Sequence, residues 1–394
     1  MKPVVVSVLS RPPNPTRDGL AIRNYHLLTA LAEEFRVRAF ALRDPARPYA
    51  GEAPAGVSLE EILQTTRRVR RAVAASGSLV SGQPYSEWLY RSPALERRVA
   101  EAADAEKPAW IIAHSYHVAP AALSAGAPVW IDFHNRDSEI WARTGETSRS
   151  ALTGAFARSQ AARVEAFERE LLRRAAGVSC VSARDAAVLK TAGGPEPVVV
   201  PNGVDLLRYA FRSNAPLEEL VFFVGDLSWP PNAEGVRWLR EKVWPAVRRK
   251  RPAARAEILG REAPDWLQAL SASDFRLLGE GGDTRPYWAR AAVAAVPLLA
   301  GGGSRLKILE AAASGVPVVS TAVGAEGLEL SPGEEISIRD EPEAFADAVV
   351  RLLADPDAAR TQAVKARARV EALYDWKRIG PRFARTLAER AGAS

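Results

Sequence analysis

The sequence has few of the residues that disulfides and metal clusters require. It contains one cysteine, Cys180, and four histidines among 394 residues. A single cysteine excludes an intramolecular disulfide framework and a thiolate metal cluster. The histidines and carboxylates show neither the HExxH spacing of a zinc-binding helix nor the spacing of an EF-hand loop. We therefore expect no metal, and a reducing compartment suits the sequence.

Long hydrophobic runs are also lacking. The longest stretch without a charged residue, 108–131, has the length of a membrane span but contains Pro120, Pro128 and two histidines. Proline disrupts a helix interior, so we expect a strand, a loop and a strand here. The apolar run at 4–9 is too short for the hydrophobic region of a signal peptide. A cytoplasmic protein is expected.

Composition indicates the size and the partners only in outline. A hydrophobic content of 47% and a charged content of 25% are those of a soluble globular protein. The length suggests roughly two to three domains of about 150 residues each. The net charge of +6 and the isoelectric point near 9.5 suit acidic small molecules or an anionic membrane surface. This excess is small for a protein that binds nucleic acid.

The N-terminal segment has the pattern of a Rossmann-like unit. A strand is expected over 2–9, an amphipathic helix opens at Gly19, and a second strand follows over 37–42. The connecting loop lacks GxGxxG, which argues against tightly bound NAD. Residues 59–105 are expected to be mostly helical and carry the cluster RRVRR at 67–71. That cluster is either a solvated helix face or a site for docking onto anionic lipid.

Three of the four histidines follow two expected strands. The strand at 109–113 is followed by His114 and His117, and the strand at 128–133 by His134. In open α/β sheets, ligands sit at the carboxyl ends of the strands. A polar site is therefore expected at these two ends, against the alternative that each histidine is structural.

A change of pattern divides the chain into two α/β halves. Glycine and proline interrupt the pattern at 193–197, before VVVPNGVD at 198–205, where we expect the hinge. A second series of strands that end in glycine follows, as a doubly wound sheet requires. The last segment, 374–391, reads as a helix with a break or kink at Pro381. Further strands are expected at 177–182, 220–224, 256–260, 275–278 and 292–297.

The most informative stretch is AGGGSRLKILEAAASGVPVVSTAVGAEGL at 300–328. Its glycines precede Ser304, which can cap a helix that carries Lys307 and Glu310, and a buried strand is expected over 316–321. Glycine lets backbone N–H groups approach an anion, and the helix N-terminus adds positive partial charge. The pattern therefore predicts a phosphate-binding turn. The alternative is an ordinary loop followed by a surface ion pair.

Four segments combine into a pattern that is typical of one family. They are VVVPNGVDLLRY (198–209), VFFVGDLSWPPNAEGVRWL (221–239), AVPLLAGGGSRLKILEAAASGVPVVSTAVGAEGL (295–328) and YDW (374–376). Together they make the chain resemble the glycosyltransferase family 4 enzymes of the GT-B fold. The resemblance implies an α/β protein whose two Rossmann-like, doubly wound domains face a cleft. The implied domains are an N-terminal acceptor-side domain at 1–197, joined by a C-terminal helix at about 375–394, and a donor-binding domain at 198–374.

The resemblance also implies a function. The expected activity is retaining, metal-independent, hexosyltransferase-like transfer from a nucleoside diphosphate sugar to an acceptor hydroxyl, in bacterial polysaccharide or glycoconjugate biosynthesis. The nucleotide sugar is a co-substrate, and no cofactor is expected. The acceptor would be a glycan, a lipid-linked glycan or a small metabolite, with peripheral contact at the inner membrane face as a further expectation. Two alternatives stay open: a nucleotide-sugar 2-epimerase of the same fold, and a degenerate transferase that only binds nucleotide.

The donor site is carried over residue by residue. Glu310 matches the carboxylate that binds the ribose hydroxyls of the donor. Lys307 and the glycine turn match the diphosphate clamp, with Arg305 as a second cation. Both cations are therefore catalytic candidates as well as donor contacts. The other expected donor contacts are Gly225, Asp226, Gly302, Gly303 and Ser304.

On the acceptor side, Gly19 matches the loop that approaches the diphosphate, and His114 matches a histidine near the reacting sugar. His134 is a further catalytic candidate around the sugar and acceptor. Two positions depart from the family: Gly302 stands where a Glu is common, and Asp226 stands where a cation is common. We expect backbone N–H groups of the glycine turn to hold the hydroxyls of the transferred sugar in place of the missing Glu.

Overall fold

The computed structural model describes residues 2–46, 51–147, 150–212, 216, 218–300 and 305–392. These residues form two compact α/β units. The first unit contains the chain up to Pro201 and the C-terminal segment from Lys377, and the second contains the described residues from Asn202 to Trp376. The motif at 198–205 thus spans the division between the units.

The first unit is built on a seven-stranded parallel sheet with the strand order β3-β2-β1-β4-β5-β6-β7. β1 pairs with both β2 and β4, so the strand order reverses beside β1. β4 and β5 are buried along their whole length, as strands covered on both faces are. The strands are β1 (Val4–Leu9), β2 (Arg36–Arg43), β3 (Val57–Leu63), β4 (Trp110–His114), β5 (Val129–Phe133), β6 (Gly177–Cys180) and β7 (Val198–Val199).

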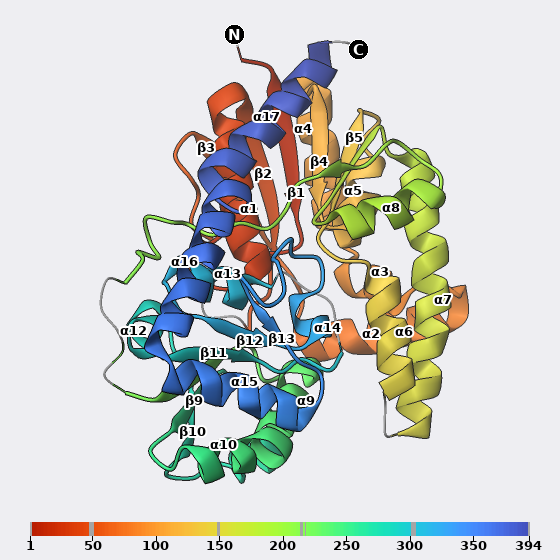
Figure 1. Ribbon diagram of the computed structural model, residues 1–394. Helices are drawn as coiled ribbons and strands as arrows, with labels where there is room; N and C mark the ends of the chain where they lie inside the picture. Colours follow the sequence, from red (N-terminus) through yellow and green to blue (C-terminus); the bar gives the residue numbers. More distant parts are fainter. Residues whose placement is uncertain are drawn as a thin grey trace. The chain divides into compact units, whose positions relative to one another are not determined.

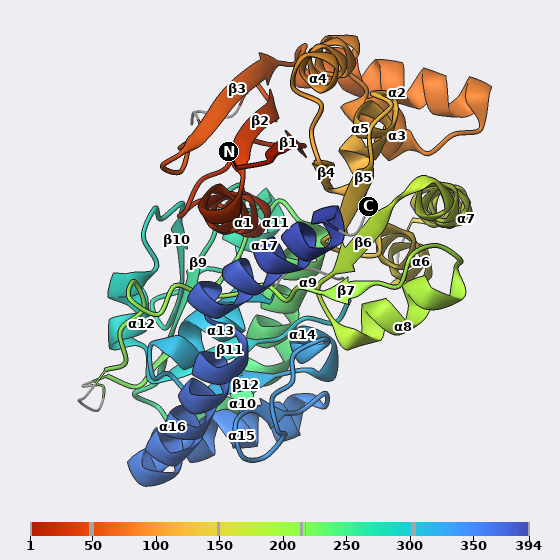
Figure 2. The ribbon, with the colours of Figure 1, turned by 90° about the horizontal axis from the view of Figure 1, so that it is seen from above.

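Helices cover both faces of this sheet, which makes the unit doubly wound. Figure 2 shows α1 and α17 on one face and α4 and α5 on the other. The helices are α1 (Gly19–Glu34), α2 (Arg67–Ser81), α3 (Tyr85–Tyr90), α4 (Pro93–Glu106), the 3-10 turn η1 (Tyr116–Val118), α5 (Ala119–Leu123), α6 (Asp137–Thr147), α7 (Ala151–Arg174), α8 (Ala183–Thr191) and α17 (Trp376–Gly392).

The last helix, α17 (dark blue in Figure 1), returns the chain to the first unit. Its Leu387 carbonyl accepts a hydrogen bond from Trp110 Nε1 at 3.0 Å, and its Phe383 ring lies 5.9 Å from the Trp130 ring. The helix continues through Pro381. Of the two expectations, a break or a kink, the break is therefore absent.

The second unit has a six-stranded parallel sheet in the order β10-β9-β8-β11-β12-β13. Its strands are β8 (Leu220–Val224), β9 (Arg255–Leu259), β10 (Phe275–Gly279), β11 (Val293–Val296), β12 (Val318–Ser320) and β13 (Ser337–Ile338). Its helices are α9 (Pro230–Trp238), the π-helical segment η2 (Leu239–Val243), α10 (Trp244–Lys250), α11 (Asp265–Gln268), α12 (Arg285–Arg290), α13 (Leu306–Ala313), α14 (Ala322–Ala325), α15 (Pro342–Ala354) and α16 (Pro356–Leu373).

One strand lies in a segment expected to be mostly helical. Residues 57–63 form β3, which pairs in parallel with β2 at the edge of the first sheet. Its two carboxylates are compensated by arginines from neighbouring elements: Arg98 Nε lies 2.7 Å from Glu60, and Arg43 Nη1 lies 3.1 Å from Glu61. These ion pairs are long-range contacts, so the local pattern does not reveal the strand.

The stretch at 108–131 forms β4, η1, α5 and the start of β5, which confirms that it is not a membrane helix. In the part of the chain that the structure describes, every helix is too short or too polar to cross a bilayer. Residues 230–250 form a continuous helical run, in which α9 is followed by the π-helical segment η2 and then by α10. Pro245 lies in the first turn of α10, directly after the π-helical segment.

Candidate functional site

Lys307 lies in the first turn of α13, beside the carboxyl end of β8. Its Nζ donates a hydrogen bond to Asn232 Oδ1 at 2.8 Å and lies 4.1 Å from the centroid of the Phe223 ring. Burial, together with the nearby charge of Arg305, lowers the pKa of Lys307 to about 7. An anion bound beside Lys307 would therefore favour the protonated form of the lysine.

Gly225 directly follows β8 and leaves the space that Lys307 uses. A Cβ at this position would lie 3.0 Å from Lys307 Nζ and 2.8 Å from Asn232 Nδ2. Asn232 Nδ2 also donates to the Asp226 carbonyl at 2.9 Å, which ties the start of α9 to the strand end. Gly225, Asn232 and Lys307 therefore pack as one group.

Asp226 is paired with an arginine from the next strand end. Arg261 follows β9, and its Nε and Nη2 donate to Asp226 Oδ2 at 3.0 and 2.5 Å. Burial raises the pKa of the Asp226 carboxyl, but the bonds from Arg261 and Ser228 outweigh it and hold the pKa below its usual value. Arg261 thus supplies a positive charge at these strand ends. Asp226 itself stands at a position where a cation is common in the family that the sequence resembles. Sequence reasoning missed Arg261, although Gly260-Arg261 follows its strand as Gly225-Asp226 does.

Glu310 lies one turn after Lys307 on α13. Its Oε2 accepts hydrogen bonds from Trp288 Nε1 at 3.0 Å and from Thr284 Oγ1 at 3.2 Å. Tyr209 OH lies 2.9 Å from Thr284 Oγ1 and extends the network. Burial raises the pKa of Glu310, and the hydrogen bond from Trp288 opposes that rise. The carboxylate is thus oriented by Trp288 of α12 and by Thr284, the N-cap residue of that helix, neither of which the sequence singled out.

Arg305 makes contacts that the sequence did not predict. Its Nε donates to the Glu326 carbonyl at 3.2 Å, and its Nη2 lies 3.6 Å from Glu326 Oε2. Arg305 is also the N-cap residue of α13, with a left-handed φ of 50°, where Ser304 was expected to cap. Gly302, Gly303 and Ser304 lie outside the described residues.

The first unit places His114 and His134 at the carboxyl ends of the adjacent strands β4 and β5. His114 is fully buried, its Nε2 lies 3.2 Å from Ser7 Oγ, and burial lowers its pKa to about 3. This imidazole is therefore neutral at physiological pH. His134 Nε2 lies 3.0 Å from Asp132 Oδ2, and burial lowers the pKa of His134 as well.

Asp132 is held by a buried arginine that the sequence did not single out. Arg23 of α1 donates to both carboxylate oxygens of Asp132, from Nε at 2.9 Å and from Nη2 at 2.8 Å. Both side chains are fully buried. Burial opposes ionisation of Asp132, but the charges of Arg23 and His134 hold its pKa well below the usual value. The ion pair with Arg23 therefore orients the carboxylate that contacts His134.

Gly19 is the first residue of α1, as expected. Asp18 caps the helix by accepting a hydrogen bond from the Ala21 backbone at 3.1 Å, and Arg11 lies 2.8 Å from the same carboxylate. The predicted residues thus fall into two sets. Gly19 and the histidines belong to the first unit, and the residues of β8 and α13 belong to the second.

Comparisons with known proteins agree with this architecture. A family model described as Glycosyltransferase Family 4 matches residues 17–208, and one described as Glycosyl transferases group 1 matches residues 218–355. The sucrose-phosphate synthase structure from Thermosynechococcus elongatus is 20% identical, with a TM-score of 0.75 over 99% of this chain and 100% of that one. The Anabaena HepE structure in complex with UDP-glucose is 16% identical, with a TM-score of 0.66 over 98% and 99% of the two chains.

Sequence similarity to a curated protein covers less of the chain. An uncharacterized 44.6 kDa protein in the cps region of Klebsiella pneumoniae is 27% identical over 168 residues, which are 40% of this chain and 43% of that protein. The chain thus matches less than half the length of this relative. The two parallel-sheet units and the matching structures define the class as an α/β protein of the GT-B fold. Within that class, the chain belongs to the glycosyltransferase family 4-like proteins.

Proposed function

We propose that this protein is a retaining glycosyltransferase that moves a sugar from a nucleoside diphosphate sugar to an acceptor hydroxyl, without a metal. The observation that carries the proposal is the pairing of Lys307 with Glu310 on one face of α13. A desolvated cation at the first turn suits a diphosphate, and an oriented carboxylate one turn later suits the ribose hydroxyls. The family resemblance implies the same two roles.

The lysine would act on the leaving group. When the sugar departs, negative charge develops on the diphosphate, and a cation fixed in a partly desolvated site stabilises that charge without reorganisation. The hydrogen bond to Asn232 and the contact with Phe223 hold the ammonium in place before the donor binds. Arg261, anchored by Asp226, is the second cation that we assign to the diphosphate, while Arg305 is occupied by Glu326.

Glu310 would act on binding more than on the chemical step. Trp288 and Thr284 both donate to Oε2, which orients the carboxylate. A carboxylate that is ionised accepts two hydroxyl hydrogen bonds from a vicinal diol such as ribose. In the first unit, neutral His114 would serve as a hydrogen-bonding group near the transferred sugar rather than as a charge. The attack of the acceptor on the same face as the leaving phosphate needs no carboxylate nucleophile.

The donor and acceptor are proposed by class. Structures of HepE hold UDP and UDP-glucose, so uridine nucleotides are the first donors to test. The Klebsiella relative lies in a cps region, which fits an acceptor in glycoconjugate or polysaccharide biosynthesis. The helix α2 exposes Arg67, Arg68 and Arg71 together with Val69 and Val73, which suits peripheral contact with anionic lipid at the inner face of a membrane.

A thermal-shift screen of nucleoside diphosphates and their sugars tests the donor class, because a ligand that binds only the folded state raises Tm. Stabilisation by one base, abolished in Lys307→Ala and retained in the exposed-lysine variant Lys365→Ala, is expected. The stabilising donor is then incubated with and without an acceptor panel. A glycosylated acceptor supports the transferase, an epimer formed without acceptor supports a 2-epimerase, and binding without turnover supports a degenerate protein. Absence of any nucleotide-dependent stabilisation would refute the proposed site.

A further inference from the structure

A small cavity lies in the first unit, at the carboxyl ends of its three outermost strands on the β3 side. It has a volume of about 50 Å³. The cavity, which we call the Gln64 pocket, is lined by Ser10 after β1, Arg43 and Asp44 at the end of β2, Gln64 after β3, Arg11 and Arg70. Carboxyl ends of parallel strands are where open α/β sheets bind ligands.

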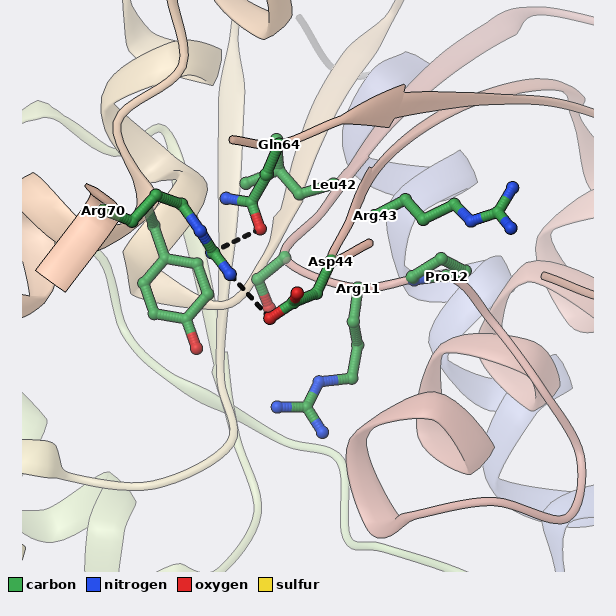
Figure 3. Close-up of a pocket in the computed structure, with 9 residues that line it drawn as sticks. Arg11, Pro12, Leu42, Arg43, Asp44, Gln64 and Arg70 are labelled. Carbon is green, nitrogen blue, oxygen red and sulfur yellow. Dashed lines mark hydrogen bonds and ion pairs between the residues drawn. The ribbon is translucent and has the colours of Figure 1, made fainter. Parts of the chain in front are cut away.

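The side-chain oxygens of Asp44 and Gln64 in the Gln64 pocket already accept hydrogen bonds. Arg70 Nη2 donates to Asp44 Oδ2 at 2.6 Å and Nη1 donates to Gln64 Oε1 at 2.5 Å, as the dashed lines in Figure 3 show. The other oxygen of Asp44 accepts from the Ala46 backbone at 3.0 Å. The pocket therefore offers few acceptors to a ligand.

Hydrogen-bond donors, in contrast, remain available in the Gln64 pocket. Gln64 Nε2 is buried and has no hydrogen-bond partner among the residues that the structure describes. Because Gln64 Oε1 faces the guanidinium of Arg70, the amide cannot flip to use this nitrogen without losing that bond. Arg70 has five N–H donors, and its bonds to Thr65, Gln64 and Asp44 use three of them. A group that only accepts hydrogen bonds fits this surplus.

The arginines of the lining and the volume of the cavity further limit which groups can bind there. Three arginines and one aspartate line the cavity, and the carboxylates that pair with Arg11 and Arg43, those of Asp18 and Glu61, lie outside that lining. Arg70 is only 12% exposed, which limits screening by solvent. A water molecule needs roughly 10–15 Å³ of such volume, so this cavity holds a group of a few polar atoms rather than a whole sugar ring.

From these observations we propose that the Gln64 pocket binds an oxyanion, a phosphate or a carboxylate, that is carried by the acceptor substrate. Gln64 Nε2 and Arg70 donate the hydrogen bonds, and Asp44 fixes the orientation of the guanidinium. The proposal rests on the proposed function in one respect, which is that the oxyanion belongs to the acceptor. It predicts that the acceptor is a phosphorylated or an acidic sugar compound.

The experiment measures oxyanion binding directly. The full chain is titrated by calorimetry with inorganic phosphate and, separately, with acetate at constant ionic strength. We expect saturable binding with a Kd on the order of 1 mM for at least one of the two. Gln64→Leu, which keeps the volume and the charge, should weaken that binding by about tenfold or more, because a hydrogen bond to a charged group is lost. Phosphate alone indicates a phosphorylated acceptor, and acetate binding indicates an acidic sugar.

Two variants distinguish an oxyanion in the pocket from one bound elsewhere on the protein. Arg169→Met removes one exposed arginine of α7 in the same unit, away from β3 and the pocket lining, and should leave the Kd unchanged. Lys307→Ala should also leave it unchanged. If Lys307→Ala abolishes oxyanion binding and Gln64→Leu retains it, the oxyanion binds at the donor site and the proposal is overturned. A lack of any saturable binding would also overturn it. Nucleotide binding by Gln64→Leu is measured in parallel, so that failure of the pocket leaves the proposed function standing.

Discussion

The lowered pKa of Lys307 predicts that donor affinity depends on pH. Without donor, this lysine titrates near pH 7, because burial disfavours its charged form. A bound diphosphate favours the ammonium and raises the pKa, so binding takes up a proton wherever the free site is neutral. The donor is a diphosphate esterified at both ends, so it does not itself titrate near neutrality. Affinity should therefore be highest below pH 7 and fall as the pH rises.

The size of the effect follows from the fraction of lysine that is protonated. If only the ammonium form binds well, the Kd for nucleotide sugar rises about tenfold per pH unit above the free pKa. Between pH 6 and pH 8.5 this gives roughly a 30-fold loss of affinity, or about 2 kcal/mol. Calorimetry in two buffers with different ionisation enthalpies should show uptake of about 0.9 proton at pH 8.

Two variants test the assignment to this one lysine. Lys307→Arg keeps a permanent charge and should flatten the pH profile, because arginine stays protonated throughout. Lys365→Met removes an exposed lysine of the same unit, which pairs with Glu334, and should retain the profile of the wild type. A flat profile in the wild-type protein, or an unchanged slope in Lys307→Arg, would refute the reasoning.

Three further predictions concern groups that position the site. Trp288→Phe removes a hydrogen bond to Glu310 and should raise the KM for the nucleotide sugar roughly 5- to 15-fold, about 1–1.5 kcal/mol, with kcat little changed. Trp266→Phe, at an exposed position, is the control. Equal kinetics in the two variants would contradict the role of Trp288. Gly225→Ala places a methyl group 3.0 Å from Lys307 Nζ and should weaken nucleotide binding in calorimetry, whereas Gly282→Ala, with nothing within 4 Å, should not. Asp132→Asn removes the counter-charge of the buried Arg23 and should lower the free energy of unfolding by about 3–5 kcal/mol in denaturant titrations, so a loss below 1 kcal/mol would count against a buried ion pair.

Most of the secondary structure was predictable because its signal is local. The strands at Val4–Leu9, Val129–Phe133 and Leu220–Val224 are apolar runs of the kind that parallel sheets bury on both faces, and α1 begins at the predicted Gly19. The missed strand, β3, lies at a sheet edge and carries two carboxylates. Its stability depends on arginines distant in sequence, such as Arg98, and no local pattern reports such contacts.

The candidate site, like the secondary structure, was predictable from the sequence only in part. The sequence by itself determined the α/β class, the repeated strand–glycine pattern and the joint presence of Lys307 and Glu310 on one helix, because these depend on spacing along the chain. Only the tertiary structure decided which partners these residues have. Asn232 holds Lys307, Trp288 holds Glu310, and Arg261 joins Asp226.

The dependence on tertiary contacts also explains why the sequence did not reveal the partner of Arg305 or the Gln64 pocket. Spacing placed Arg305 beside Lys307 as a second cation, but in the folded chain its side chain meets Glu326. Arg70 stood out only as one member of a charged cluster, and Gln64 showed no signal, since a glutamine becomes informative only when burial leaves its amide without a partner. Residue type and spacing determine what chemistry is available. Burial and contacts between distant segments decide which of those groups are already satisfied and which can bind a ligand.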